Sequence, residues 1–450
     1  MGDEVTSAAD GGSVVGPVAR GPADDGRTGG ARGGAHGAHL GRVIMQWLDE
    51  LSECSEDPGE LTRRYLTPEH AQAADIVMRR MREAGMSAWL DAVGNVVGRA
   101  PGRQPGTRRL ILGSHLDTVR NAGKFDGALG VMLPIVCLKS LHERGERLDY
   151  PVDVIAFGDE EGLRFQATLI GSRAVAGDFD PELLSVGDED GVALREALRD
   201  FGLDPEAVDE ARYRRDDVAG YVEVHIEQGP VLEAENRPVG VVTSIAGATR
   251  LRVEIIGRAG HAGTVPMDLR RDALAAASEA VIAVERICSG IAGAVGTVGV
   301  LRTLPGAVNV IPGAVEFTVD VRAGNDGHRR SALRQIDEAF AAFAARRGVL
   351  FDTVTTHETG ACECSPGLID RLGGAVAAEG LAVRELPSGA GHDAIAMAHL
   401  TDVGMLFVRC RDGISHHPAE SMTEADAEVA ARVMLRFLER FDPNEGRSSR

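Results

Sequence analysis

The stretch that decides the fold is Ile111-Leu-Gly-Ser-His-Leu-Asp-Thr-Val-Arg-Asn-Ala-Gly-Lys-Phe-Asp-Gly127. Its apolar start ends at Gly113-Ser114, and three ionisable side chains follow closely: His115, Asp117 and Asp126. Charged groups beside a buried strand must be paired or must hold a metal ion. We therefore expect this stretch to carry the first ligands of a two-metal hydrolase, with later segments completing the site.

Composition narrows the class of protein. The chain has 450 residues, of which 44% are hydrophobic and 26% charged, as is usual for a globular enzyme with more than one domain. Its formal net charge of −20 argues against nucleic acid or an anionic membrane as a partner. No apolar run approaches the roughly 18 residues of a membrane span. An anionic substrate would need arginines placed locally.

Residues 1–38 contain eleven glycines and almost no large apolar side chains, so we predict a disordered tail. This tail lacks the charged-then-apolar pattern of a signal peptide, and we expect a cytoplasmic protein. The six cysteines are scattered, which favours free thiols in a reducing compartment. Cys362 and Cys364 are close together, but such a pair is a weak metal signal and receives no role.

An α/β pattern covers residues 39–245 and 358–450. Segments predicted as strands alternate there with amphipathic helices, and the main strands are 109–116, 152–157, 221–226 and 403–408. This alternation is typical of an α/β sheet, in which ligands bind beyond the carboxyl ends of the strands. Polar clusters follow these predicted strand ends, and so we expect a di-metal catalytic domain.

Residues 246–357 have a different pattern. The expected strands are 250–256, 297–301, 315–321 and 349–355, and the expected helices are 269–288 and 326–346. The order βαββαβ is that of a ferredoxin-like unit, which forms a complete small domain. We interpret this segment as a domain inserted into the first.

Candidate metal ligands follow the predicted strand ends, and they are His115, Asp126, Glu160, Glu161, His225 and either His416 or His417. Nitrogen and carboxylate donors without thiolate suit Zn²⁺, Mn²⁺, Co²⁺ or Ni²⁺. A single histidine is more often structural, and an Asp-Gly pair is usually a turn, but the joint pattern indicates a site. Asp117 could accept the other N–H of the His115 imidazole and thereby fix its tautomer.

Several motifs carry a wider resemblance: Gly113-Ser-His-Leu-Asp-Thr118, Asp126-Gly127, Asp159-Glu-Glu-Gly162 with Arg164-Phe165, His225-Ile-Glu-Gln-Gly-Pro230, Gly260-His-Ala-Gly-Thr-Val-Pro-Met267, Arg270-Arg-Asp272, Asn309-Val-Ile-Pro-Gly313, Ser388-Gly-Ala-Gly-His-Asp393 and Ile414-Ser-His-His-Pro-Ala-Glu420. Over residues 40–441 the chain resembles the amidase branch of the peptidase M20 superfamily. That branch comprises allantoate amidohydrolases, N-carbamoyl-L-amino acid hydrolases and β-ureidopropionases.

The resemblance implies two divalent metal ions per chain, held by two terminal pairs and one bridge: His115 with His225, Glu161 with His416, and Asp126 between them. Glu160 would be the general base that moves the proton of the attacking water. His417 falls at a position that varies in the family, and so we leave it out.

The resemblance also implies the substrate contacts. Asn309 and Arg322 match positions that hold the substrate's carboxylate, for which a planar guanidinium is suited. His261 matches a histidine that reaches the partner's site in a homodimer built through the inserted lid domain, where it stabilises the transition-state oxygen. Further contacts would come from Gln228, Gly389 and Gly391. Arg270 and Arg271 could contact substrate or pair with Asp272.

The implied reaction is hydrolysis of the ureido C–N bond of a small anionic substrate. Allantoate is our first expectation, N-carbamoyl-L-amino acids are the alternative, and ureidoglycolate or β-ureidopropionate are further options. A metal-free binding protein with this fold would be expected to have lost a ligand or Glu160, and none is lost. A serine hydrolase built on Ser114 would need a Gly-x-Ser-x-Gly elbow, which that position lacks.

Overall fold

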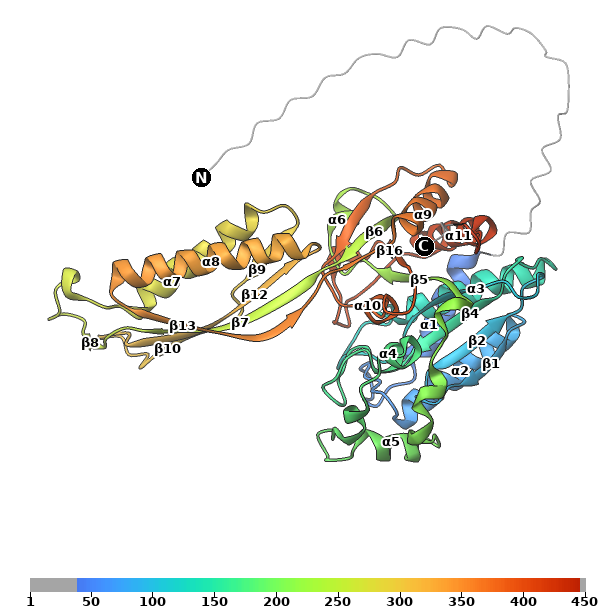
Figure 1. Cartoon of the computed structure of the whole chain (residues 1–450), viewed down its shortest axis with the longest axis horizontal. Helices are drawn as coiled ribbons and strands as arrows, with labels where there is room; N and C mark the ends of the chain where they lie inside the picture. Colours follow the sequence, from blue (N-terminus) through green and yellow to red (C-terminus); the bar gives the residue numbers. More distant parts are fainter. Residues whose placement is uncertain (1–38, 446–450) are drawn as a thin grey trace, which may run out of the picture. The chain divides into compact units, whose positions relative to one another are not determined.

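The computed structural model describes residues 39–445 (Figure 1). The predicted disordered tail, residues 1–38, lies outside the described residues. Two sheets organise the described part, one mixed with nine strands and one antiparallel with five. The expected mixed α/β fold is therefore confirmed.

The nine-stranded sheet carries the predicted site. Its strand order is β1 (Ser87–Leu90), β2 (Val96–Ala100), β4 (Val152–Phe157), β3 (Arg109–His115), β5 (Val218–Ile226), β16 (Val403–Val408), β6 (Val239–Ile245) and β14 (Cys362–Glu363), with β15 (Glu385–Ser388) also paired to β6. The central strands β4, β3, β5 and β16 are mutually parallel, so their carboxyl ends meet at one edge. These strands are almost fully buried because helices cover both faces.

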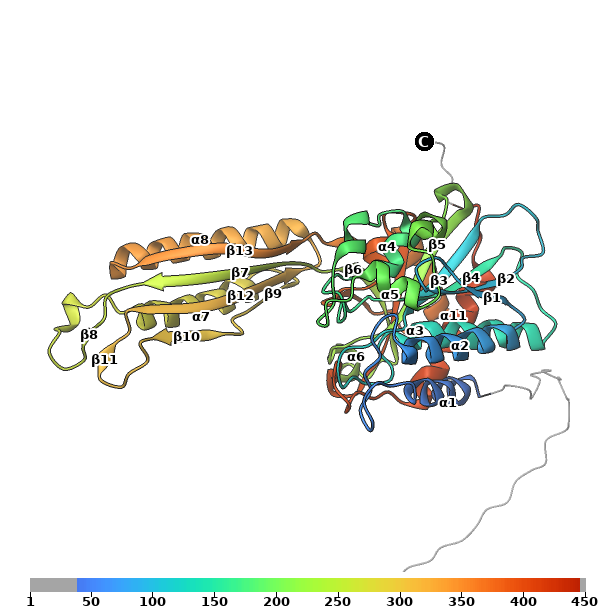
Figure 2. The ribbon, with the colours of Figure 1, turned by 90° about the horizontal axis from the view of Figure 1, so that it is seen from below.

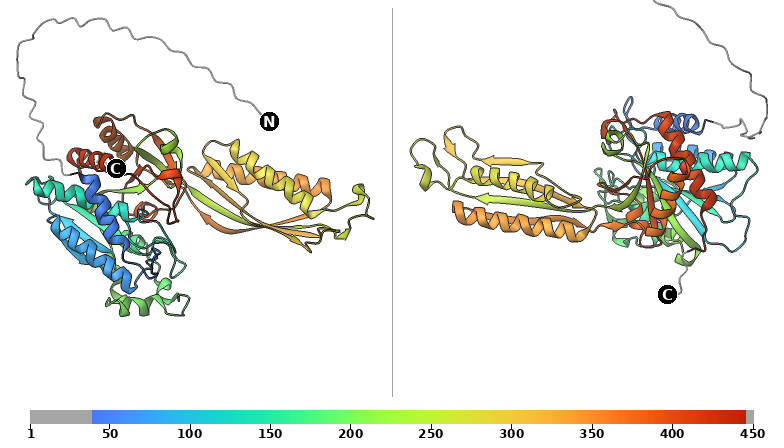
Figure 3. Two further views of the ribbon diagram at one scale, coloured as in Figure 1. Left: turned by 180° about the vertical axis from the view of Figure 1, so that it is seen from behind. Right: turned by 90° about the horizontal axis from the view of Figure 1, so that it is seen from above.

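The helices of this sheet form two layers. One layer holds α1 (Leu40–Ser52), α2 (Pro68–Glu83), α3 (Ala128–Glu143), α9 (Pro366–Ala378) and α11 (Glu424–Arg440), and the other holds α4 (Ile170–Ala176) and α10 (Ala394–Met397). The first and last helices of the described chain, α1 and α11, pack side by side (Figures 2 and 3). Helix α3 is apolar on nearly all sides, because it is enclosed by the sheet, α1 and α11. No helix among residues 39–445 is long and apolar enough to cross a membrane.

The five-stranded sheet is antiparallel and has two helices on one face (Figure 2). It consists of β7 (Gly247–Ile256), β9 (Ala294–Thr297), β10 (Leu301–Leu304), β12 (Ala314–Ala323) and β13 (Leu350–Thr359), covered by α7 (Ala273–Ser289) and α8 (Asp326–Arg347). The predicted strand over 297–301 is wrong, because two shorter strands flank that segment. Opposite it, the Thr318 hydroxyl accepts the N–H of Val300 at 3.2 Å while the Thr318 N–H still donates to the Val300 carbonyl at 3.1 Å, so one of the two ladder bonds at this position goes to a side chain.

The remaining elements are short. Strands β8 (Gly260–His261) and β11 (Val310–Ile311) pair with each other beyond the end of β7. Helices α5 (Leu194–Asp200) and α6 (Val231–Ala234) lie in connections, as do the 3₁₀ turns η1 (Pro181–Ser185), η2 (Pro205–Ala211), η3 (Arg215–Asp217), η4 (Met267–Leu269) and η5 (Arg411–Gly413). Strand β6 was not predicted, because the short apolar run Val239–Ile245 is compatible with a buried loop as well as with a strand.

Candidate metal centre

Four strand ends converge on one group of polar side chains. His115 ends β3 and His225 lies near the end of β5, while Glu160 and Glu161 follow β4 and His416 follows β16. Asp126 stands immediately before α3 and lies among them. The four strands are parallel neighbours in the sheet, which explains how residues 300 positions apart in sequence come within a few ångströms.

Asp126 is the centre of this group. Its Oδ1 lies 3.0 Å from His225 Nε2 and 3.5 Å from His115 Nε2. Its Oδ2 lies 3.3 Å from His416 Nε2, which is itself 3.5 Å from Glu161 Oε1. One carboxylate oxygen therefore faces each of the two predicted terminal pairs.

These separations fit shared metal ions. Two atoms each held about 2.1 Å from one ion lie about 3.4 Å apart at the tetrahedral angle. Asp126 Oδ1 is also buried and accepts no well-directed hydrogen bond, which is costly for an ionised oxygen unless a cation contacts it. The donor set, three imidazoles and two carboxylates, suits a borderline divalent ion.

Gly127 allows this approach. It has a left-handed φ of 66°, and a Cβ there would lie 2.4 Å from the His115 ring. Any larger residue would displace the imidazole. The Asp126-Gly127 pair is thus required by the packing of His115, beyond the usual role of such a pair as a turn.

Asp117 joins two of the converging loops. Its carboxylate accepts the backbone N–H of Glu160 at 3.0 Å and that of Glu161 at 3.1 Å. The Nδ1 atom of His115 lies 2.9 Å from the carbonyl oxygen of Asp117 but 3.8 Å from its carboxylate. The imidazole is therefore oriented by the main chain of Asp117, while the side chain orients the Glu160-Glu161 loop.

The electrostatics of the group are those of crowded charges. Burial and neighbouring acids raise the pKa of Glu160 to about 8 and that of Glu161 to about 7. A hydrogen bond to Asp126 raises the pKa of His416 to about 9. Burial opposes ionisation of Asp126, but three imidazoles together hold its pKa well below the usual value. Without metal ions, this crowding of negative charge favours protonated carboxyls and protonated imidazoles. Divalent cations can supply the same positive charge and so replace those protons.

Sequence reasoning missed the residues that hold Asp126. The Ser415 hydroxyl donates to Asp126 Oδ2 at 2.7 Å, and Gln228, predicted to touch substrate, donates to the same oxygen at 2.9 Å. Buried Glu420 accepts the backbone N–H groups of Phe125 and Asp126 and contacts Ser415. Ser415 and Glu420 belong to the motif Ile414-Ser-His-His-Pro-Ala-Glu420, and their place beside His416 in that motif could have indicated their role. Gln228 and His416 both have left-handed φ, a strained conformation that is common at functional sites.

A second polar group lies behind His225. Glu223, His225 and His392 are close enough to hold an ion, but Glu223 contacts Ser114, Tyr221 and the Ala394 N–H, and His392 contacts Ser388. Glu223 and His392 therefore already have hydrogen-bond partners within the chain. Ser114 is fully buried and its hydroxyl donates to a carboxylate, so the serine-hydrolase alternative has no support.

Arg322, Gly389, Gln228 and His416 line one cavity of about 710 Å³. The Arg322 guanidinium donates to the carbonyl of Gly389 at 2.9 Å and to both carboxylate oxygens of Asp320, at 2.9 and 3.2 Å. Gly391 lies beside Glu160, since a Cβ on this glycine would be 3.7 Å from the Glu160 carboxylate. These predicted residues are therefore brought to the metal group.

His261 and Asn309 are brought to each other instead. His261 pairs with Val310 across β8 and β11, and the Asn309 carbonyl accepts the N–H of Ala262. Both residues are exposed and neither lines the cavity described above. Arg270 donates to the carbonyls of Ala262 and Val265, so it supports the loop of His261.

The cysteine pair has a packing role. Cys362 begins the edge strand β14, and both Cys362 and Cys364 pack against the core beneath β6. Burial raises the pKa of their thiols to about 11 and about 12. These residues act as small apolar side chains, which explains them without a metal.

The fold and this group of side chains define the class: an α/β enzyme with a buried site suited to divalent cations. Residues 111–440 match the model of peptidase family M20/M25/M40. The chain belongs to this family and is a hydrolase.

Two relatives and one solved structure locate the chain within the family. It is 42% identical to allantoate deiminase 1 of Glycine max, over 87% of this chain and 88% of the relative. It is also 42% identical to N-carbamoyl-L-amino acid amidohydrolase of Geobacillus stearothermophilus, over 88% and 97%. The crystal structure of an amidase of the hydantoinase/carbamoylase family from Burkholderia multivorans superposes with a TM-score of 0.83 at 33% identity, covering 88% and 97% of the two chains.

Proposed function

We propose that this protein hydrolyses the ureido C–N bond of allantoate. The observation that supports this proposal most directly is the geometry of Asp126. One of its carboxylate oxygens faces the pair His115 and His225, and the other faces the pair Glu161 and His416. The similarity to allantoate deiminases over most of the chain supports the choice of substrate. N-carbamoyl-L-amino acids are the second candidate, because a carbamoyl amidohydrolase is equally similar and is covered almost completely.

His115, His225 and Asp126 would hold one ion, and Asp126, Glu161 and His416 the other. Zn²⁺ and Mn²⁺ fit this donor set, as do Co²⁺ and Ni²⁺. When bound, such ions would polarise the scissile carbonyl and make the attacking water more acidic.

Glu160 would take a proton from the attacking water and return it to the leaving nitrogen as the C–N bond breaks. Asp117 fixes the backbone of Glu160, which supports this role by limiting where the carboxylate can lie. Positive charge placed beside Glu160 lowers its pKa, so the carboxylate could then act as a base at neutral pH.

Arg322 would bind the carboxylate of the substrate. The Asp320 carboxylate accepts from Nε and Nη2 along one edge of the guanidinium, and the Gly389 carbonyl accepts from Nη1, so the side chain is held in one orientation at the cavity wall. A guanidinium oriented in advance binds a carboxylate at lower entropic cost.

We further place residues 39–245 and 358–450 in a catalytic domain and residues 246–357 in an inserted, ferredoxin-like lid. Strand β7, with ten residues, runs from the start of this segment toward the loop of His261 and spans about 33 Å. His261 and Asn309 would then serve the site of a second chain, in a homodimer built through this segment. Exposed apolar side chains in the segments after β8 and before β11 support such an interface: Met267, Leu269, Leu304 and Val308.

Free thiols support a reducing, cytoplasmic location, since all six cysteines are unpaired. The function is tested by measuring ammonia release from allantoate, N-carbamoyl-L-methionine and N-carbamoyl-β-alanine side by side with Mn²⁺ present. We expect the highest kcat/KM for allantoate. A higher value for N-carbamoyl-L-methionine would replace the proposal with its alternative, and no release from any of the three would overturn both.

A further inference from the structure

A short segment, residues 61–67, runs along the loop that carries the first predicted ligands. The Leu61 carbonyl accepts the N–H of Ala122, and the Thr62 hydroxyl accepts that of Asn121. Arg63 and Thr118 bond each other twice, through backbone and hydroxyl, at 2.9 and 3.0 Å. Residues 61–67, which we call the bracing segment, therefore follow the ligand loop over several residues.

Arg63 is the deepest part of the bracing segment and is only 1% exposed. Its Nε donates to the carbonyl of Leu116 at 2.8 Å, directly between His115 and Asp117. Its Nη1 donates to the carbonyls of Leu51 and Cys54, at 3.0 and 3.1 Å, where α1 ends. One side chain thus ties the ligand loop to the end of a helix.

The charge of Arg63 requires an explanation. Its three acceptors are main-chain carbonyls, and burial lowers its pKa to about 10, so it remains a cation at neutral pH. A buried cation is costly unless nearby groups compensate it. Interactions with Cys54 and Asp117 partly offset this lowering of the Arg63 pKa. The Asp117 carboxylate is the one that orients Glu160 and Glu161.

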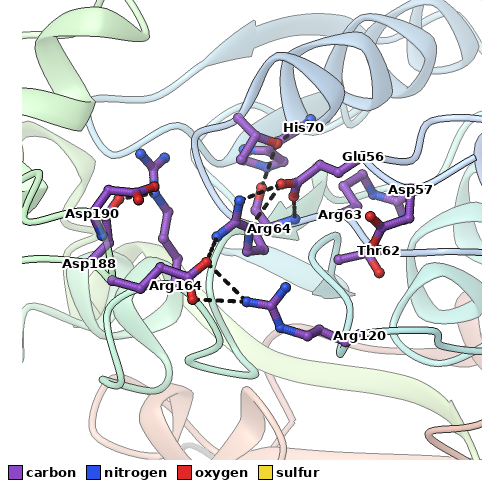
Figure 4. A network of polar contacts seen from close by, with 12 residues as sticks. Glu56, Asp57, Thr62, Arg63, Arg64, His70, Arg120, Arg164, Asp188 and Asp190 are labelled. Carbon is purple, nitrogen blue, oxygen red and sulfur yellow. Dashed lines mark hydrogen bonds and ion pairs between the residues drawn. The ribbon is translucent and has the colours of Figure 1, made fainter.

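A second arginine fastens the same segment to the other loop. Arg164, shortly after Glu161, donates to the carbonyls of Tyr65 and Leu66 at 2.9 Å and pairs with Asp188 (Figure 4). The bracing segment therefore contacts both loops that supply ligands from β3 and β4.

We infer that Arg63 is a positioning residue for the metal centre. It fixes residues 116–118, and through Asp117 it fixes the Glu160-Glu161 backbone, so that the two loops keep the spacing that divalent ions need. The inference rests on the two-ion site of the proposed function, but it does not depend on which ureide is the substrate. An arginine is needed because its planar fork reaches Leu116 and the end of α1 together, whereas lysine presents one point charge.

Arg64 supplies a matched control. It is the next residue of the bracing segment, but its side chain donates to Glu56 and Glu189 and makes no direct bond to the ligand loop. An indirect link runs through Glu189, which also pairs with Arg120, and both of these side chains are exposed at the surface (Figure 4). Substituting Arg64 should perturb the segment's surface without moving the ligands.

The experiment compares Arg63→Lys, Arg63→Met and Arg64→Ala with the unaltered chain. Each protein is stripped with a chelator, and Mn²⁺ binding is measured by calorimetry, ion content by mass spectrometry, and the melting temperature of the metal-free form by circular dichroism. We expect Arg63→Lys to bind Mn²⁺ at least tenfold more weakly, in the range found when residues behind metal ligands are altered. At saturating Mn²⁺ its kcat should fall more than its KM rises, and Arg64→Ala should bind Mn²⁺ normally.

Unchanged Mn²⁺ affinity in Arg63→Lys would overturn the inference, even if the melting temperature fell, since that pattern is purely structural. If Arg63→Met does not fold, Arg63→Lys still decides the question. A chain that binds Mn²⁺ tightly but releases no ammonia from any ureide would overturn the proposed function, and weaker Mn²⁺ binding by Arg63→Lys in that same chain would still support the role of Arg63.

Discussion

The edge of the nine-stranded sheet and the far end of the five-stranded sheet treat their polar residues in opposite ways. His115, Asp126 and His225 are 2%, 5% and 1% exposed, and each is held by neighbouring strands or backbone. His261 and Asn309 are exposed and lie at the two-stranded sheet of β8 and β11. The comparison teaches that one chain brings the predicted metal ligands together by itself, whereas His261 and Asn309 would reach a site only in the proposed homodimer.

The physical reason lies in what surrounds each site. Four buried parallel strands, with helices packed on both faces, fix the backbone from which the predicted ligands project. The small sheet of β8 and β11 has two residues in each strand. Two short strands are marginally stable by themselves, so a second chain packed against nearby apolar side chains would stabilise them.

The largest effect should come from Glu160→Gln. Removing the proton acceptor should lower kcat about 10²- to 10⁴-fold while the ions remain bound, because Glu160 is not among the predicted ligands. Steady-state kinetics with metal analysis checks this, and Glu182→Gln, an exposed acid outside the site, is the control. A metal-loaded variant with a near-normal rate would contradict the assignment.

A comparable loss, about 10²-fold, is expected for His261→Ala if this residue stabilises the developing oxyanion. The decisive version mixes this variant with Glu160→Gln under conditions that exchange subunits. Each mixed dimer would then contain one complete site, so the mixture should recover about a quarter of the original activity. Absence of recovery, with exchange verified by mass spectrometry, would place His261 outside the partner's site.

Arg322→Ala should raise the KM for allantoate about 10- to 100-fold with a smaller change in kcat, as expected when a charge-assisted bond of 1.5–3 kcal/mol is lost. Asp320→Asn should act in the same direction but less, because it loosens the guanidinium without removing it. Initial-rate kinetics over a range of substrate concentrations checks both variants. An unchanged KM in Arg322→Ala would argue against a grip on the substrate carboxylate.

The smallest effect concerns stability, and it should arise in the nine-stranded half. Burial lowers the pKa of His70 to about 3, well below its value in the unfolded chain, so the unfolded state binds the extra proton. Stability should therefore fall as the pH drops, by about 2 kcal/mol between pH 7 and pH 5 for this residue. Urea unfolding at both pH values would show it, and His70→Gln should remove that part of the dependence. An equal dependence in the variant would assign the effect to other groups.

Local chemistry explains why much of this fold could be predicted. The helix after Thr67 and the two long helices of residues 246–357 have capping side chains at their starts, which a sequence displays directly. The helix around Leu129 shows itself by the length of its apolar run, since it is buried on nearly all sides. The interruption at residues 298–300 could not be predicted, because the bond from the Val300 N–H to the Thr318 hydroxyl joins residues that are distant in sequence.

By itself, the sequence determined which residue types end the central strands, and with them the predicted ligand set from His115 to His416. Only the tertiary structure decided which atoms meet: the carbonyl of Asp117 on His115, its carboxylate on the Glu160-Glu161 backbone, and Arg63 behind both. The reason is the distance in sequence over which each effect acts. Periodicity and turn preference act over a few residues, whereas sheet order and the packing of a buried cation depend on segments that are distant in sequence and adjacent only after folding.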